Sequence, residues 1–133
     1  MKTNFDRLFK TDKAKETEGI WYTFPDNDAA FLLRRFGGEN TTLVKKAMAR
    51  YYKPYAKQID LGMLPDEKVT EIMAKIFVDV CLLDWKNIEV DGEDAPFSKE
   101  LAVKVLVHLP ELMDKLTALA NDTESFKEDL GNY

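Results

Sequence analysis

The sequence predicts a small, mainly α-helical protein of one domain, with an N-terminal β-hairpin packed on the helices. Three observations predict this fold class. The chain has 133 residues, which suits one domain with a single hydrophobic core. Apolar residues recur at steps of three and four over much of the chain after residue 40. Two short aromatic-rich runs flank a turn sequence at about 20–36, as in a hairpin.

Composition places the chain among folded proteins. Apolar residues make up 45% and charged residues 32%, unlike a disordered chain. No apolar run approaches the ~18 residues that a membrane span requires, so we expect no membrane association. No secretory signal is visible at the start, and Cys81 is the only cysteine, so an internal disulfide is excluded. These features predict a protein of the reducing cytoplasm.

Charge is distributed unevenly along the chain. Residues 1–60 hold 12 Lys and Arg against 8 Asp and Glu, whereas residues 61–133 hold 7 against 16. The first part therefore carries +4 and the second −9, which gives the net charge of −5. Because an acidic half repels a phosphate backbone, the charge argues against a protein that coats nucleic acid with its whole surface.

The N-terminal part divides into a polar segment and a predicted hairpin. Residues 1–18 are polar and lysine-rich, 19–130 form the predicted domain, and 131–133 are a tail. Within the domain, the runs Ile20–Phe24 and Ala30–Phe36 flank the turn residues Pro-Asp-Asn-Asp. An isolated hairpin is marginal in water, so its apolar face should pack on the helices that follow. We assign Trp21, in the first run, to the core.

A first main helix is predicted after residue 40. Asn40 or Thr41 can cap its N-terminus. Pro54 lacks an amide proton, so it should kink or stop the helix near Tyr52 or Lys53. One side of this helix carries apolar and aromatic residues: Val44, Ala47, Met48, Tyr51 and Tyr55.

The longest predicted helix runs from Pro65 to about Lys86. Its apolar stripe is widened by Phe77, Cys81 and Trp85, so it should contact neighbours on more than one side and be the central helix. We assign Phe77 to the core. The stripe itself consists of Val69, Ile72, Met73, Ile76, Val80 and Leu83.

Two further helices are predicted near the C-terminus. Ser98 is the expected N-cap of the first, and Pro110 interrupts the pattern before a second apolar helix begins. A last turn is expected around Phe126 and Leu130.

No residue pattern indicates catalysis, a metal site or a cofactor. The loop at 87–98 begins like a calcium-binding loop, but its closing position is Ser98 rather than glutamate, and Pro96 interrupts it. A solvated acidic turn is therefore predicted. His108 is the only histidine, and Cys81 lies in an apolar run where its thiol should be buried and inert. We therefore expect a protein that is not an enzyme.

One helix face indicates an alternative function in nucleic-acid binding. Basic residues recur there at steps of four, three and four, with aromatic residues nearby. The competing interpretation is a solvated face of an amphipathic helix, which is the more common occurrence. The four residues are Lys46, Arg50, Lys53 and Lys57.

The number of large rings indicates a protein–protein contact surface. The chain has 15 Phe, Trp and Tyr residues, the sum of its 8, 2 and 5. So many rings should leave some exposed for a partner, although others pack in the core. The candidate interaction residues are Tyr51, Tyr52, Tyr55, Trp85, Phe97 and Phe126.

Several short motifs follow one another in a fixed order along the chain. They are Asp84-Trp85, Asp91-Gly92, Pro96-Phe97-Ser98 and Leu109-Pro110-Glu111-Leu112, and the run "EGIWYTF…AAFLLRRFGGEN" precedes them. This series resembles the tail assembly chaperones of long-tailed, siphovirus-type bacteriophages and prophages. In that family, an Asp-Trp pair ends a helix before an acidic loop with glycine, a Pro-aromatic pair leads into the next helix, and a Leu-Pro-Glu-Leu step opens the last one. The earlier run resembles the family's N-terminal part. The similarity spans about residues 18–126.

This resemblance implies a non-catalytic function in viral morphogenesis. Such chaperones bind the tape measure protein, a long apolar helical chain, and assist the tail tube protein to polymerise around it. They act in the cytoplasm of the infected or lysogenic host and are absent from the mature virion. Many are made in two lengths by ribosomal frameshifting, and the ending "GNY" would suit the shorter product. Exposed rings would favour self-association into a homo-oligomer.

Overall fold

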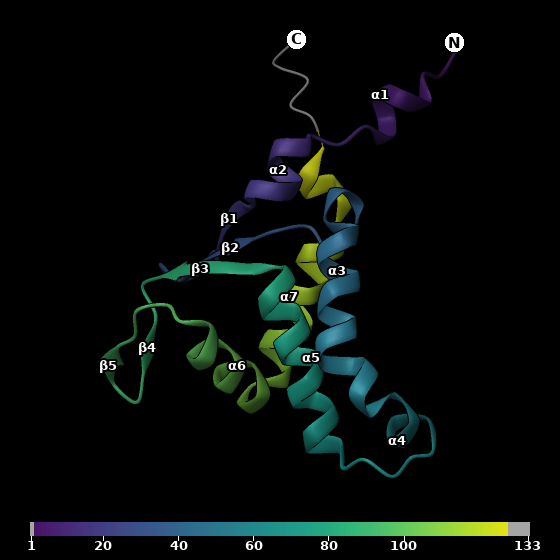
Figure 1. The fold of residues 1–133 in the computed structure, drawn as a ribbon. Helices are drawn as coiled ribbons and strands as arrows, with labels where there is room; N and C mark the ends of the chain where they lie inside the picture. The colour runs from purple at the N-terminus through teal and green to yellow at the C-terminus, as the bar shows by residue number, and fades with distance from the viewer. Residues whose placement is uncertain (1, 128–133) are drawn as a thin grey trace.

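The computed structural model describes residues 2–127 (Figure 1). The predicted tail at 131–133 and the predicted turn residue Leu130 lie outside this range. The α-helices are α1 (Phe5–Phe9), α2 (Lys13–Glu18), α3 (Thr41–Ala47), α4 (Ala56–Asp60), α5 (Asp66–Val80), α6 (Lys99–His108) and α7 (Pro110–Asn121). The strands are β1 (Ile20–Thr23), β2 (Ala30–Leu33), β3 (Leu82–Lys86), β4 (Glu89–Val90) and β5 (Glu93–Asp94). Shorter helical segments are η1 (Gly38–Asn40), η2 (Met48–Tyr52), η3 (Lys53–Tyr55) and η4 (Thr123–Phe126).

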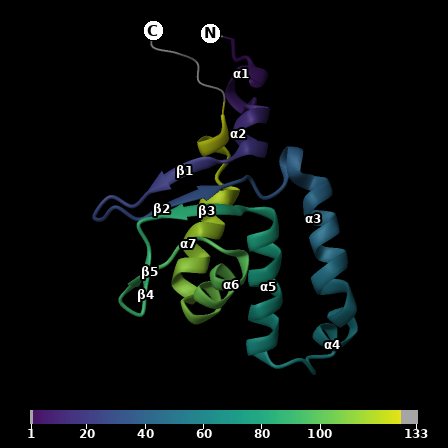
Figure 2. The same ribbon diagram turned by 60° about the vertical axis from the view of Figure 1, so that its left-hand side comes forward.

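The sheet corrects the predicted fold class. Strands β1, β2 and β3 form one antiparallel sheet in that order, with Tyr22 opposite Phe31 and Phe31 opposite Trp85. Two short helices precede β1, and β3 completes the sheet from far along the sequence (Figures 1 and 2). The prediction of a mainly α protein with a separate N-terminal hairpin on its helices is therefore wrong. The protein is a small helix-rich domain with an integral sheet.

The third strand arises where the sequence predicted the end of the central helix. Helix α5 ends at Val80 rather than continuing to Lys86, and the chain then pairs with β2. The Arg34 amide donates a hydrogen bond of 2.7 Å to the Cys81 carbonyl at the junction. Without β3, one edge of β2 would lack hydrogen-bond partners, so tertiary pairing overrides the local helical periodicity.

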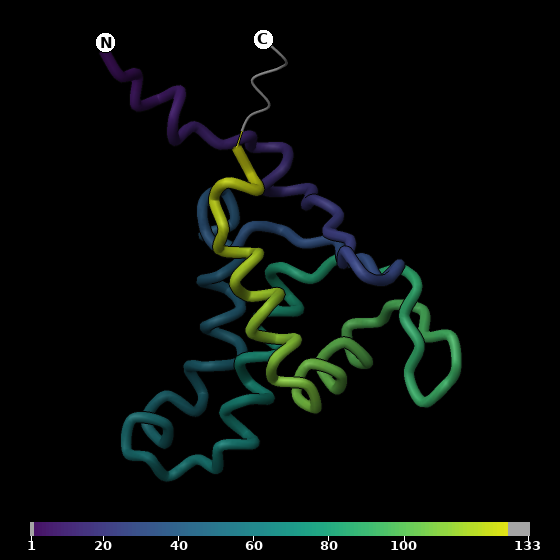
Figure 3. Tube along the Cα trace, turned by 180° about the vertical axis from the view of Figure 1, so that it is seen from behind, coloured from purple at the N-terminus to yellow at the C-terminus, as the bar shows by residue number. Residues whose placement is uncertain are grey.

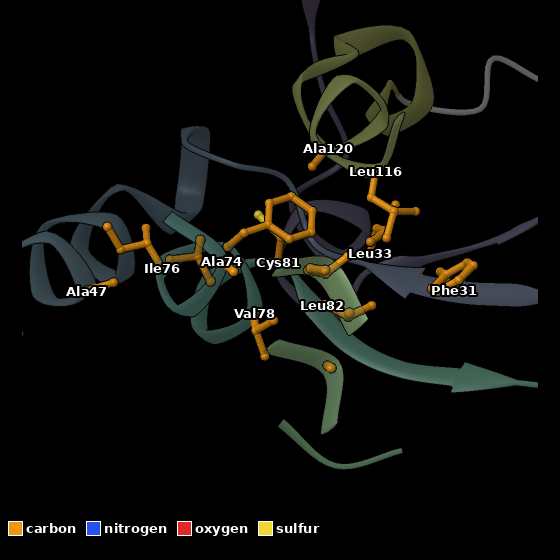
Figure 4. Packing of buried hydrophobic residues seen from close by; sticks show 14 of the residues in the cluster. Phe31, Leu33, Ala47, Ala74, Ile76, Val78, Cys81, Leu82, Leu116 and Ala120 are labelled. Atoms are coloured by element: carbon orange, nitrogen blue, oxygen red, sulfur yellow. The ribbon is translucent and has the colours of Figure 1, made fainter. Parts of the chain in front are cut away.

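Helix α5 is the centre of the core, as predicted. It contacts α3, η2, α6 and β3, and α7 packs against β2. Phe77 is buried, but Trp21 is not in the core: 39% of its surface is exposed, and the Lys86 ammonium lies 3.9 Å from its ring centroid. Figure 4 shows buried side chains from α3, α5, the sheet and α7 packed together.

In the chain before α5, the helix changes geometry near Pro54, as predicted, but Asn40 does not act as the predicted N-cap. At Pro54 the regular helix α3 has given way to a π-helical segment, η2, and then to a 3₁₀ turn, η3. Asn40 does not cap α3 with its side chain. Instead it is 2% exposed, and its Nδ2 donates to the carbonyl oxygens of Glu16 at 2.7 Å and Arg35 at 2.9 Å.

The last two helices agree with the sequence prediction. The Ser98 hydroxyl accepts a hydrogen bond of 3.1 Å from the Leu101 amide and so caps α6. Pro110 begins α7, where its missing amide proton costs nothing. The turn expected around Phe126 is η4, which buries that ring completely. Within the described residues, no helix is both long enough and apolar enough to span a bilayer.

Candidate protein-binding groove

An open groove of about 950 Å³ lies over α5, between η2 and α6. Three valines give it an apolar lining: Val78 is buried beneath the surface, and Val103 and Val107 on α6 are half-buried. We call these three residues the valine strip. Because the helix period brings residues four apart to one face, Val103 and Val107 both reach the groove from α6.

Charged side chains of both signs line the groove beside the valine strip. On α5, the Lys75 ammonium lies 2.9 Å from a Glu71 carboxylate oxygen. On α6, Lys104 lies 3.7 Å from Glu100. The hydrogen bond and charge of Lys75 hold the pKa of Glu71 below its ordinary value. The remaining charged lining residues are Arg50, Glu67, Asp79 and Lys99, and His108 also lines the groove.

A tyrosine and an aspartate join the two walls of the groove. The Tyr51 hydroxyl of η2 donates a hydrogen bond of 2.7 Å to Asp79 on α5, and Lys99 at the start of α6 lies 3.4 Å from the same carboxylate. Burial and the hydrogen bond to Asp79 raise the pKa of Tyr51 above its ordinary value. This cluster fixes the spacing of η2, α5 and α6 near one end of the groove.

The Asp-Trp and Pro-Phe motifs position the α6 wall. Trp85 is only 6% exposed, and its indole Nε1 donates a hydrogen bond of 2.6 Å to the Ala95 carbonyl. The Phe97 ring lies edge-on to it, with 5.3 Å between centroids. These contacts hold the segment before Ser98, where α6 begins. The motifs that carry the family resemblance therefore have a structural role here.

The six predicted interaction residues separate into three groups. Trp85 and Phe126 are buried, so they present no contact surface and that part of the prediction is corrected. Phe97 is half-buried against Trp85. Of the three tyrosines, all half-buried, Tyr51 alone lines the groove. The others, Tyr52 and Tyr55, pack against the core cluster.

The sequence analysis did not predict the valine strip. Val103 and Val107 are apolar residues on a helix, and the sequence pattern alone cannot distinguish a valine that lines a groove from one that packs in the core. The large apolar side chains that are most exposed lie outside the groove. They are Phe5 and Phe9 in α1, each about 70% exposed, and Leu61 and Met63 before α5, at 62% and 72%.

The acidic loop is a small exposed hairpin. Strands β4 and β5 pair through a tight turn in which Asp91 and Gly92 have φ angles of 54° and 78°. Their side of the molecule lies away from α3 and α4 (Figures 1 and 2). Among the described residues, no group of three or more His, Cys, Asp or Glu side chains could hold a metal ion. Residues 91–94 are exposed, which agrees with the predicted solvated turn.

The two residues considered for catalysis, His108 and Cys81, differ in their exposure to solvent. His108 is exposed at the end of α6 and lines the groove. Cys81 is completely buried, and burial raises the pKa of its thiol to about 12. Such a thiol is uncharged at neutral pH and unreactive.

The predicted basic face is exposed throughout. Its helix changes from α to π to 3₁₀ geometry between residues 41 and 55, so the four side chains do not lie on one straight helix. Arg50 packs over the Tyr51 ring, 5.2 Å from its centroid, and also lines the groove. The exposed residues are Lys46, Arg50, Lys53 and Lys57.

Comparison with curated proteins and with solved structures finds no match. A family model, that of the YdaY prophage protein, matches residues 39–130. This region contains both walls of the groove and the motif residues from Asp84 to Leu112, whereas α1, α2, β1 and β2 precede it. Because the match covers more than half of the chain, this is a prophage protein that belongs to the YdaY prophage protein family.

Proposed function

We propose that this prophage protein is a tail assembly chaperone. It binds the tape measure protein, keeps that long helical chain soluble, and assists the tail tube protein to assemble around it, without catalysis. The observation that carries the proposal is the open groove with its valine strip and its charged residues of both signs. Membership of a prophage family and the ordered motifs at 84–112 support the same function.

The groove suits an amphipathic helix as its occupant. An α-helix with side chains is about 10–12 Å across, and helix-in-groove binding inserts apolar residues at steps of three and four. The valine strip offers apolar contact to such a stripe, and the flanking ion pairs offer partners for the polar residues beside it. Valines select for apolar character more than for one particular sequence, which suits a long client with many similar segments.

The proposal has consequences for location and assembly. The protein acts in the cytoplasm of the infected or lysogenic host and does not remain in the mature virion. Its excess of acidic residues keeps a complex with an apolar client in solution.

The test is co-expression with the tape measure protein of the same prophage. The wild type should shift that client from the insoluble to the soluble fraction and elute with it from a sizing column. The double variant Val103→Thr/Val107→Thr keeps the side-chain shape but adds two hydroxyl groups to the groove, so client recovery should fall at least about tenfold. Val105→Thr is the matched control, because Val105 is half-buried on the same helix but does not line the groove.

Two results would contradict the proposal. One is a client that remains insoluble with the wild type and forms no complex. The other is equal client recovery with the groove variant and with Val105→Thr, which would place binding elsewhere on the surface.

A second candidate function rests on the exposure of the basic face. Residues 41–60 hold five Lys and Arg against one acidic residue, so this region could contact a phosphate backbone. The hypothesis predicts salt-sensitive binding to duplex DNA that weakens in Arg50→Ala/Lys53→Ala. A gel shift at low salt tests it, and the absence of any bound species would rule it out.

A further inference from the structure

Most of the charged side chains that line the groove are already paired with one another. Four basic and four acidic residues line it. Six of them form three ion pairs: Glu71 with Lys75 at 2.9 Å, Asp79 with Lys99 at 3.4 Å, and Glu100 with Lys104 at 3.7 Å. A client charge that approaches one member of a pair also meets the opposite charge beside it, so attraction and repulsion largely cancel. These six side chains therefore favour neither sign of charge in an occupant.

Arg50 and Glu67 are the two charged lining residues that remain. Both are exposed, and within residues 2–127 neither side chain forms an ion pair or a hydrogen bond. The Arg50 guanidinium lies over the Tyr51 ring, 5.2 Å from its centroid, and the Tyr51 hydroxyl is held by Asp79. This contact positions the guanidinium but adds no negative charge to balance it. We call Arg50 and Glu67 the free ions of the groove.

The free ions lie toward opposite ends of α5. The first turn of α5, which contains Glu67, is the end of the helix farthest from the sheet (Figures 1 and 3). Asp79 is three turns later, about 18 Å along the helix axis. Since the Tyr51 hydroxyl bonds Asp79, the guanidinium over that ring lies toward this second end. The groove therefore offers an unbalanced positive charge and an unbalanced negative charge at separate places.

We propose that the free ions select amphipathic helices that carry an acidic side chain for Arg50 and a basic side chain for Glu67 beside their apolar stripe. The inference rests on the proposed function, because it specifies which helical segments of the tape measure protein the groove takes. A guanidinium can hold a carboxylate through two parallel hydrogen bonds. The Glu67 carboxylate can accept hydrogen bonds from a lysine or an arginine of the client.

The valine strip and the free ions have different roles in this arrangement. Apolar contact with the valine strip is available to any helix with an apolar stripe, so it contributes affinity without choosing between segments. The free ions discriminate, because a like charge placed against either of them is repelled as well as left without a partner. A segment with the wrong charges is therefore rejected even where its apolar stripe fits.

Four synthetic peptides test the selection. All share one leucine stripe at helical spacing over about 20 residues, and they differ only in one charged residue near each end of the stripe. Two are mixed, with the acidic residue at one end or at the other; the third has two acidic residues and the fourth two basic ones. In fluorescence anisotropy, the wild type should bind the better mixed peptide at least about tenfold more tightly than either like-charged peptide.

Reversing the charge of one free ion should switch this preference. Arg50→Glu leaves two free anions, so the peptide with two basic residues should bind best. Glu67→Lys leaves two free cations, so the peptide with two acidic residues should bind best. The double variant exchanges the two signs and should prefer the other mixed peptide. A gain of affinity for a new peptide cannot result from misfolding.

Lys53→Glu and Asp66→Lys are the matched controls. Each makes the same change of net charge as one groove variant, at an exposed position in the same segment that does not line the groove. Both should keep the wild-type order of peptides. If Lys53→Glu switches the preference as far as Arg50→Glu does, the overall charge of the basic segment governs binding, as in the nucleic-acid hypothesis, and the inference is overturned.

Two further results would also overturn the inference: a wild type that binds none of the peptides, or one that binds all four equally. Neither result bears on whether the protein solubilises its client. Conversely, a tape measure protein that stays insoluble while the peptides follow the expected order would contradict the proposed function and leave the selection of helices by the free ions intact.

Discussion

Replacing Asn40 by alanine should destabilise the protein far more than the loss of a helix cap would. The Asn40 amide is buried and donates two hydrogen bonds, to the carbonyls of Glu16 and Arg35. Each such bond contributes about 1 kcal/mol, and an unpaired buried carbonyl costs a further ~1–3 kcal/mol. The Glu16 carbonyl keeps a hydrogen bond from the Arg35 amide, so the further cost falls on the Arg35 carbonyl alone. The free energy of unfolding should fall by about 3 kcal/mol.

Urea denaturation followed by tryptophan fluorescence measures this effect. With a slope of ~2 kcal/mol/M, the midpoint should fall by about 1.5 M. Thr41→Ala is the control, because Thr41 is exposed and its hydroxyl donates one hydrogen bond of 2.7 Å, to the Gly38 carbonyl. It should cost only about 0.5 kcal/mol. Equal midpoints for the two variants would refute the role assigned to Asn40 in joining α2 to the start of α3.

Three further predictions concern the scaffold. The buried Glu16 carboxylate on α2 forms an ion pair with the Arg35 guanidinium. Gly38→Ala would place a methyl group against this pair at a φ of +52°, so it should cost roughly 3 kcal/mol in thermal unfolding. Gly62→Ala, at a φ of +66° but in open space, should cost only about 1 kcal/mol. Trp85→Phe should lower the free energy of unfolding by about 2 kcal/mol, since it leaves the Ala95 carbonyl without its indole partner. Cys81 should not react with a thiol reagent at pH 8 until the protein unfolds; rapid labelling of the folded protein would contradict its burial.

The pKa of Cys81 also predicts a pH dependence of stability. Its folded-state pKa of about 12 lies above the ordinary value of 9.0, because burial disfavours the thiolate. The stabilisation is therefore fully present below pH 9 and is lost as the pH rises towards 12, by ~1.4 kcal/mol per unit. Cys81→Ala should remove this part of the slope in urea titrations between pH 9 and 11. An unchanged slope would show that other groups cause the loss.

Local signals predicted those elements whose ends are marked by specific side chains. Ser98 and Pro110 mark the starts of α6 and α7, and Pro54 lies in the 3₁₀ turn that follows the π-helical segment after α3. The third strand could not be predicted in this way. Apolar residues continue past Val80 at helical spacing, and only the hydrogen-bonding edge of β2, some 50 residues earlier in the chain, makes Leu82–Lys86 a strand.

The groove was beyond sequence reasoning for a similar reason. Its lining comes from η2, α5 and α6, and no local pattern reports that these segments leave a space between them. Ring size was also a poor guide to exposure. Trp85 is buried between the rings of Phe31 and Phe97, which come from distant segments, and Phe126 is buried in η4. Phe5 and Phe9 are exposed because α1 projects away from the sheet and the other helices.

The most direct test of the account is hydrogen–deuterium exchange on the protein with and without the bound tape measure protein. If a client helix lies in the groove, protection should increase in its walls, η2, α5 and α6, with little change in β4, β5 and the basic segment at 53–57. Protection confined to that basic segment, or spread evenly over the chain, would contradict binding at the valine strip.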